Sequence, residues 1–64
     1  MKRYVVQLFD EKSCTFYDSI NTTRRSFARD WLMYALKGHT ALEVKAFVET
    51  WVNGRWSREQ VTEF

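Results

Sequence analysis

The sequence predicts a small α+β domain in ββαββ order, with one helix packed on one face of a four-stranded antiparallel sheet. Three observations lead to this prediction: an Asn53-Gly54 pair between two stretches of alternating residues, helical spacing from Thr23 to Lys37, and two further alternating stretches before that helix. At 64 residues the chain is expected to form one compact domain, residues 1–64. Its apolar fraction of 45%, rich in aromatic residues, is typical of a folded chain and not of a disordered one.

The first two strands are expected at Lys2–Phe9 and Cys14–Ile20, joined by the polar turn 10–13. One side of the first strand carries Tyr4, Val6 and Leu8. Its other side is half polar, which is typical of a sheet with only one covered face. The two strands are therefore expected to form an antiparallel hairpin at one side of the sheet.

A helix is expected from Thr23 to Lys37. The three residues suited to cap its N-terminus are Asn21, Thr22 and Thr23. The stripe predicted to face the sheet consists of Phe27, Trp31, Tyr34 and Ala35, with Ala28 and Leu32 beside it. Gly38 follows at the position where a helix often ends in a left-handed residue.

Residues 41–52 fit two structures. Thr40 and Glu43 have the spacing of a capping box, and residues 44, 47, 48 and 51 lie on one side of a helical wheel. The alternative fold therefore contains a β-hairpin, two helices and a C-terminal strand. The β-branched residues of this segment, and the alternation from Arg55 to Phe64 that needs a strand partner, favour a second hairpin instead.

The Asn53-Gly54 turn sets the register of this second hairpin, because Asn-Gly is the preferred pair for a two-residue type I′ turn. The expected cross-strand pairs are Val52–Arg55, Trp51–Trp56, Glu49–Arg58, Val48–Glu59 and Phe47–Gln60. One face then carries Val44, Ala46, Val48 and Val61, a modest apolar set suited to a core. The other face carries Phe47, Trp51, Trp56 and Phe64, interleaved with Lys45, Glu49 and Arg58. A right-handed crossover predicts the sheet order 2-1-3-4 and leaves this second face to solvent or a partner.

No motif for catalysis or cofactor binding is present. Cys14 and His39 are the only cysteine and histidine, and nothing in the sequence indicates that they form a nucleophile–base pair. Cys14 is expected to be a small buried thiol. One histidine and one cysteine do not make a metal site, and no glycine-rich loop is present to hold a nucleotide phosphate. The sequence therefore predicts a non-enzymatic protein without a metal or other cofactor.

Two sets of residues are candidates for binding. The first set, at the start of the predicted helix, consists of Arg24, Arg25 and Arg29. Cations there oppose the helix dipole, whereas an anion is readily bound at a helix N-terminus. The second set, on the uncovered sheet face, consists of Phe47, Trp51, Trp56 and Arg58.

These sets favour a protein-binding module, with the two tryptophans as anchors and the arginines for an acidic patch. The alternative is a nucleic-acid-binding module in which arginines contact phosphates and aromatic rings stack on bases. The net charge of +2 is too small to diagnose nucleic-acid binding by itself. Exposed edge strands are also suited to pairing two copies into a homodimer.

The chain is expected to be cytoplasmic and not to contact a membrane. Met1-Lys2-Arg3 has the charge of an export signal, but the apolar run that follows is too short for a signal or a membrane span. In size, absence of cofactor motifs and aromatic content, the chain resembles the small phage-encoded proteins that bind and block host factors. That resemblance implies an inhibitor or regulator of a host protein and assigns a role to no individual residue.

Overall fold

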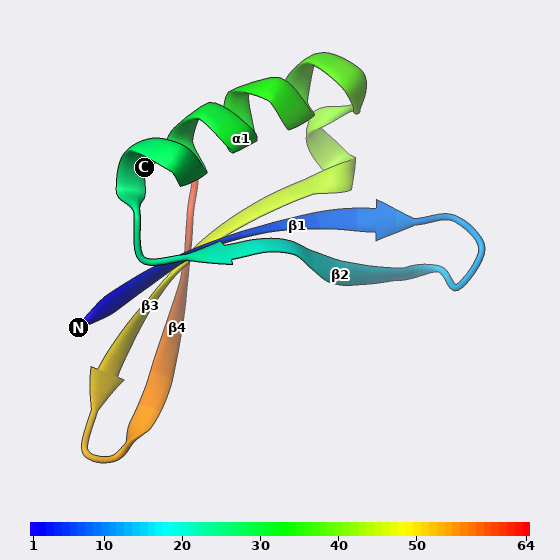
Figure 1. Cartoon of the computed structure of the whole chain (residues 1–64). Coiled ribbons are helices and arrows are strands. Elements are labelled where there is room, and N and C mark those ends of the chain that lie inside the picture. The colour runs from blue at the N-terminus through cyan, green and yellow to red at the C-terminus, as the bar shows by residue number, and fades with distance from the viewer.

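The computed structural model describes residues 1–64 and confirms the predicted ββαββ order. The elements are β1 (Lys2–Asp10), β2 (Thr15–Thr22), α1 (Arg25–Gly38), the single 3₁₀ turn η1 (Ala41–Glu43), β3 (Val44–Val52) and β4 (Arg55–Val61). The sheet order is β2-β1-β3-β4 with every neighbouring pair antiparallel, as predicted. In Figure 1, α1 lies over one face of the sheet and the ends of the two hairpins project beyond it in different directions.

The β3–β4 hairpin forms in the predicted register. Asn53 and Gly54 both have a positive φ, 51° and 79°, as a type I′ turn requires. Trp51 lies opposite Trp56, and all the other predicted pairs are present. The local preference of the Asn-Gly turn therefore decides which side chains share each face of this hairpin.

The alternative fold, with a second helix over residues 41–52, is wrong. The capping box does form, because the amide and the hydroxyl of Thr40 both donate to Oε1 of Glu43, at 2.9 and 3.0 Å. It begins only the single turn of η1, and Val44 is already extended, with a φ of −125°. The β-branched residues that follow favour the strand over a longer helix.

The first hairpin forms with a turn of the predicted length, but the turn is shifted by one residue, from 10–13 to 11–14. β2 begins at Thr15, so Cys14 belongs to the turn and not to the strand. Cys14 is exposed and has a φ of 55°, so the prediction of a buried thiol is wrong. In this turn Asp10 accepts hydrogen bonds from the Lys12 amide and the Ser13 hydroxyl, at 3.0 and 3.2 Å. Cys14 itself adopts the left-handed conformation that a glycine often supplies in such a turn.

Both ends of α1 differ from the prediction. β2 continues through Thr22, so the helix begins later and Arg24 is its N-cap, with no side-chain capping bond. The Thr22 hydroxyl accepts a hydrogen bond from the Arg24 amide at 3.1 Å, which turns the chain from strand to helix. Gly38 is the last helical residue and is not left-handed, because the helix ends at the extended residue His39, with a φ of −137°.

The core lies between α1 and the sheet. Its buried residues are Val6, Leu32, Ala35, Val44 and Ala46, against which Leu8, Ile20, Val61 and Phe64 pack. Phe64 was predicted on the opposite face, but it makes an edge-to-face contact with Tyr4 at 5.5 Å between ring centroids. β4 ends at Val61, so the alternation of the strand no longer sets the direction of a residue three positions further on.

The helix buries a narrower stripe than predicted. Its buried residues are Ala28, Leu32 and Ala35, whereas Phe27, Trp31 and Tyr34 remain exposed. Two alanines let the helix approach the sheet closely, and the larger aromatic rings next to them stay outside the contact. Relative to the prediction, the helix is therefore rotated about its axis, so that Ala28, Leu32 and Ala35 are its buried residues.

Candidate functional site

The sheet face that α1 leaves uncovered is organised around a buried carboxylate, that of Glu49. The side chain of Glu49 is only 7% exposed although no element covers it. Its Oε1 accepts bonds from Nε and Nη2 of Arg3, at 3.1 and 3.0 Å, and lies 3.4 Å from Nδ2 of Asn21. Its Oε2 accepts a bond from Nε of Arg58 at 3.0 Å. The buried charge is therefore paired on both oxygens, as its position demands.

This network continues to the far edge of the sheet. Nη2 of Arg58 on β4 contacts Oδ2 of Asp18 on β2 at 3.3 Å, and Gln7 donates to the other oxygen of Asp18 at 2.9 Å. Burial would lower the pKa of Arg58, but its hydrogen bonds with Glu49 and Asp18 and the charges of both carboxylates outweigh burial and raise that pKa. Arg58 is thus held by two acids from two other strands and is not a free cation.

Three aromatic rings of the uncovered face each have a cationic side chain over them. The Arg3 guanidinium lies 3.6 Å from the ring centroid of Trp56, and the Lys45 ammonium lies 4.1 Å from that of Phe16. Arg58 lies 5.0 Å from the ring centroid of Phe47. These are favourable cation–π distances, and they cover ring faces that a nucleic-acid base would need for stacking.

Trp51 and Trp56 form the end of this face, next to the hairpin turn. Their rings meet edge to face, with centroids 5.3 Å apart and planes 69° apart. Trp51 is half exposed, whereas Trp56 is partly covered by Trp51 and Arg3. The two rings therefore pack against each other, and Trp51 remains half exposed to solvent.

The arginine set lies in the other layer of the molecule. Arg24, Arg25 and Arg29 are all exposed at the N-terminal end of α1, and Arg29 makes one long ion pair with Asp30, at 3.8 Å. The two predicted sets of binding residues therefore do not form one site, because α1 and the face with the tryptophans lie on opposite sides of the sheet. Asp18 of β2 is bound to Arg58 and to none of these three arginines.

The arginines share α1 with an exposed row of aromatic rings, here called the aromatic ridge: Phe27, Trp31 and Tyr34. Phe27 and Trp31 lie nearly parallel, with ring centroids 6.2 Å apart and planes 15° apart. The indole of Trp31 donates to the Ser19 hydroxyl of β2 at 3.1 Å, which fixes the orientation of the ring. A shallow, almost wholly apolar depression of about 340 Å³ lies between these three rings and Asp30.

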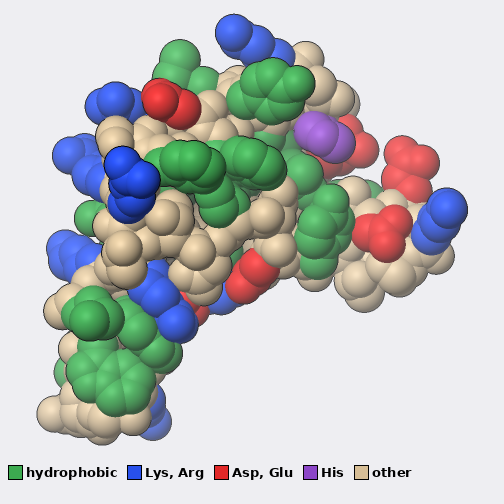
Figure 2. Space-filling model, viewed as in Figure 1, with side chains coloured by type: hydrophobic (Ala, Val, Ile, Leu, Met, Phe, Trp, Pro, Cys, Tyr) green, Lys and Arg blue, Asp and Glu red, His purple; other side chains and the backbone are tan.

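The aromatic ridge was missed as a site because its residues were assigned to the core. The sequence does contain a signal for it, namely the number of large rings on the predicted helix. A small sheet cannot cover all of them. Figure 2 shows hydrophobic side chains gathered over α1 and, separately, over the projecting β3–β4 hairpin. The structure therefore offers two exposed aromatic surfaces, one in each layer.

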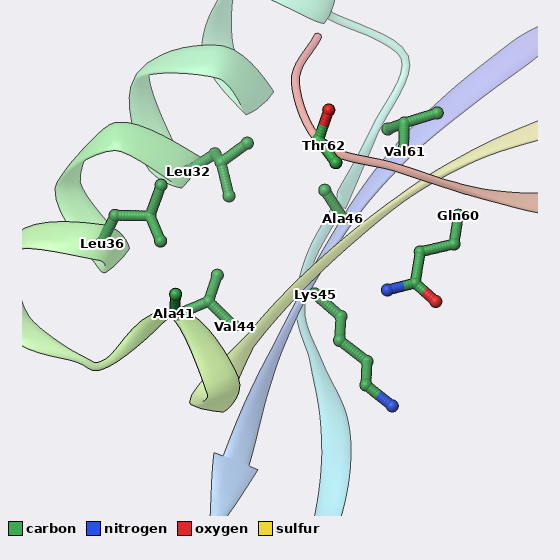
Figure 3. A pocket seen from close by; sticks show the side chains of 9 residues that line it. All are labelled: Leu32, Leu36, Ala41, Val44, Lys45, Ala46, Gln60, Val61 and Thr62. Carbon is green, nitrogen blue, oxygen red and sulfur yellow. The ribbon is translucent and has the colours of Figure 1, made fainter.

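A groove of about 340 Å³ separates α1 from β4 on the covered side of the sheet. Its lining residues, drawn in Figure 3, are Leu32, Leu36, Ala41, Val44, Lys45, Ala46, Gln60, Val61 and Thr62. Leu32 and Leu36 face Val44 and Ala41 across it, whereas Lys45 points away. The groove exists because α1 packs mainly on β1, β2 and β3.

No three side chains among His, Cys, Asp and Glu lie close enough together to hold a metal ion. No helix is long and apolar enough to cross a membrane. Comparison of the chain with protein-family models, curated proteins and solved structures finds no match. The function is therefore argued from the geometry of these surfaces.

Proposed function

We propose that this chain is a non-enzymatic protein-binding module that uses the aromatic ridge of α1 to dock on an acidic protein surface. The observation that carries the proposal is the exposure of three large rings in a row, with Phe27, Trp31 and Tyr34 exposed by 48%, 38% and 78%. Aromatic side chains are enriched among the residues that dominate binding energy at protein interfaces. A contiguous exposed apolar patch of this kind is a typical interaction site.

Two of the three rings of the ridge, Phe27 and Trp31, are held in place before any partner arrives. Phe27 and Trp31 restrain each other by stacking, and the Trp31 indole is hydrogen-bonded to β2. Ordering of side chains is one of the costs of association, so rings that are already ordered lose less entropy on binding. This supports a preformed docking surface, in contrast to rings that are merely left over from the core.

The charge around the ridge favours an acidic partner. Arg24 and Arg25 precede Phe27 in the chain and have no carboxylate within ion-pair distance, and Arg29 has only its long contact with Asp30. Basic side chains at the rim of an apolar centre accelerate association with an oppositely charged surface. An inhibitor or regulator of a host protein would fit this mode of action.

A nucleic-acid-binding module is the second candidate, favoured by the same three exposed arginines. The uncovered sheet face supports it poorly, because Arg3 and Arg58 are paired with acids and three of its rings are covered by cations. The two candidates differ in their response to salt. Phosphate contacts weaken steeply as salt rises, whereas an interface with an aromatic centre weakens much less.

The first test is photo-crosslinking in lysate from a photoreactive residue at position 34, compared with the same residue at position 17. Tyr34 on α1 and Tyr17 on β2 are both exposed tyrosines, so the second position controls for non-specific capture. A protein captured from position 34 alone, and lost with Phe27→Ala, is the expected result. Equal capture from both positions would count against the ridge.

The second test is an amide NMR titration with short single- and double-stranded nucleic acids, at low and then moderate salt. The protein-binding proposal expects no shifts at Arg24, Arg25 or Arg29 at moderate salt. Saturable shifts at these residues that fade as salt rises would instead establish the nucleic-acid candidate. Arg24→Glu with Arg25→Glu then separates the two: it abolishes phosphate binding but mainly slows association with a protein.

A further inference from the structure

The two edges of the sheet differ in how open they are to another strand. β2 is interrupted by a bulge at Ser19, where the register shifts between Val6–Ile20 and Gln7–Asp18. The hydroxyl of Ser19 is also bound by the Trp31 indole of α1. β4 pairs with β3 without any irregularity from Arg55 to Val61 and contains no proline. Bulges and proline are among the devices that block edge strands, so β4 is the open edge.

The backbone groups that β4 presents follow from its turn. In a hairpin with a two-residue turn, the pair next to the turn, Val52–Arg55, is hydrogen-bonded, and such pairs alternate along the strands. The amide and carbonyl groups of Trp56, Arg58 and Gln60 therefore point away from β3. They form a row of donors and acceptors along the free edge of the sheet.

We propose that two copies of this chain pair through β4, antiparallel about a two-fold axis at Ser57, to form one continuous eight-stranded sheet. In this register Arg55 of each copy lies opposite Glu59 of the other, on the side of the sheet that carries α1. Trp56 of each copy lies opposite Arg58 of the other, on the uncovered face. Both pairs occur twice because the interface is isologous.

The charged side chains of β4 favour this register over the neighbouring registers of the same strand pair. Because side chains alternate along a strand, the register can shift only in steps of two residues if the same face of both copies is to stay on the same side of the sheet. An axis at Arg58 places the two Arg58 side chains directly opposite each other, and an axis at Glu59 does the same with the two glutamates. Like charges directly opposite are destabilising, whereas opposite charges stabilise. The axis at Ser57 alone combines opposite charges with no like pair.

The side chains and the space that this interface needs are available. Arg55 and Glu59 are both exposed, and neither has an ion-pair partner within the chain. The β3–β4 hairpin projects beyond α1, so a second hairpin can lie beside it (Figure 1). The interface leaves the aromatic ridge uncovered, so the dimer does not depend on the proposed function.

The test is a charge exchange at positions 55 and 59, read out by sedimentation equilibrium against the 7.7 kDa monomer mass. Arg55→Glu alone places two glutamates opposite each other at each pair, and Glu59→Arg alone does the same with arginines. Each is expected to weaken the wild-type dimer by about tenfold or more. The double variant Arg55→Glu/Glu59→Arg restores both pairs and is expected to dimerise like the wild type.

Mixing the two single variants gives a sharper result. Arg55→Glu and Glu59→Arg complement each other at all four positions, so a heterodimer is expected where each variant alone is a monomer. Glu11→Arg, a charge reversal in the β1–β2 turn, is the control that leaves the dimer unchanged. A wild-type monomer up to millimolar concentration would overturn the proposal, and so would single reversals without effect or a mixture without a heterodimer.

Discussion

Arg58 of β4 and Asp18 of β2 meet at 3.3 Å across the uncovered face of the sheet, although they belong to its two opposite edge strands. In a flat sheet two further strands would keep these side chains apart. The contact exists because the sheet is strongly twisted, which Figure 1 shows as a crossing of the two hairpins. The uncovered face is therefore concave along one diagonal, and Val5 and Glu49 at its centre are buried without any covering element.

Removal of the central charge tests this network. Glu49→Gln keeps the shape of the side chain but leaves the guanidinium groups of Arg3 and Arg58 close together without their shared acid. Because these groups are about one-third exposed, the expected loss is about 2 kcal/mol of the free energy of unfolding, below that of a fully buried pair. Urea denaturation measures it.

Glu59→Gln is the control for that measurement. Glu59 lies on β4 with an exposed side chain and no partner within the chain. Its replacement is expected to change the free energy of unfolding by less than about 0.5 kcal/mol at concentrations where the chain is monomeric. Equal losses of stability in the two variants would mean that the buried, paired charge of Glu49 contributes no more to the free energy of unfolding than the exposed charge of Glu59.

Val5 gives a second test of the self-covered face. Val5 is fully buried, yet it lies opposite Phe47 on the side of the sheet away from α1. Val5→Ala is expected to lower the free energy of unfolding by about 1–3 kcal/mol, because a buried methyl pair is removed. Val52→Ala, at a valine of β3 that is 45% exposed, is expected to cost less than about 0.5 kcal/mol. Similar costs at the two positions would show that the face is open to water.

The elements and their pairing could be predicted from the sequence because each depends on local chemistry. The Asn53-Gly54 turn determines the register of one hairpin, and with it the position of Glu49 opposite Arg58. Alternation along β1 and β3 identified Val44 and Ala46 as core residues. These features need no knowledge of how the sheet twists.

The site could not be predicted to the same extent, because it depends on twist and on packing between layers. The contact of Arg58 with Asp18, and the second partner of Glu49, Arg3, come from strands that no local rule brings together. The exposure of the aromatic ridge depends on how the helix is rotated about its own axis. Small residues at its contact with the sheet set that rotation, and the apolar pattern alone had assigned the rings to the core.

The two glycines are expected to respond in opposite ways to alanine. Gly54 has a φ of 79°, which disfavours any side chain even though the space around it is open. Gly54→Ala is therefore expected to lower the free energy of unfolding by about 1 kcal/mol. Gly38 has open space and no positive φ, so Gly38→Ala is expected to be neutral or to stabilise by up to about 1 kcal/mol. Thermal denaturation of both variants measures this, and a loss of stability in both would contradict the assigned end of α1.

Glu43 makes stability depend on pH in the acid range. The Thr40 amide and then the Thr40 hydroxyl donate to its carboxylate and, with the nearby His39, lower the pKa of Glu43. A carboxyl whose pKa is lower in the folded chain stabilises the fold above the pKa of the unfolded chain. That stabilisation is lost as pH falls through the pKa of the folded state.

Glu43→Gln is therefore expected to be less stable than the wild type at neutral pH and equally stable at low pH, where the wild-type carboxyl is also uncharged. Denaturation of both chains at pH values from neutral to about 2.5, well below the ordinary pKa of glutamate, measures the difference. Glu63→Gln, at a glutamate of the C-terminus without an ion-pair partner, controls for the loss of one negative charge. A difference between wild type and Glu43→Gln that stays constant over this range would mean that the charge of Glu43 contributes nothing to the turn at Thr40.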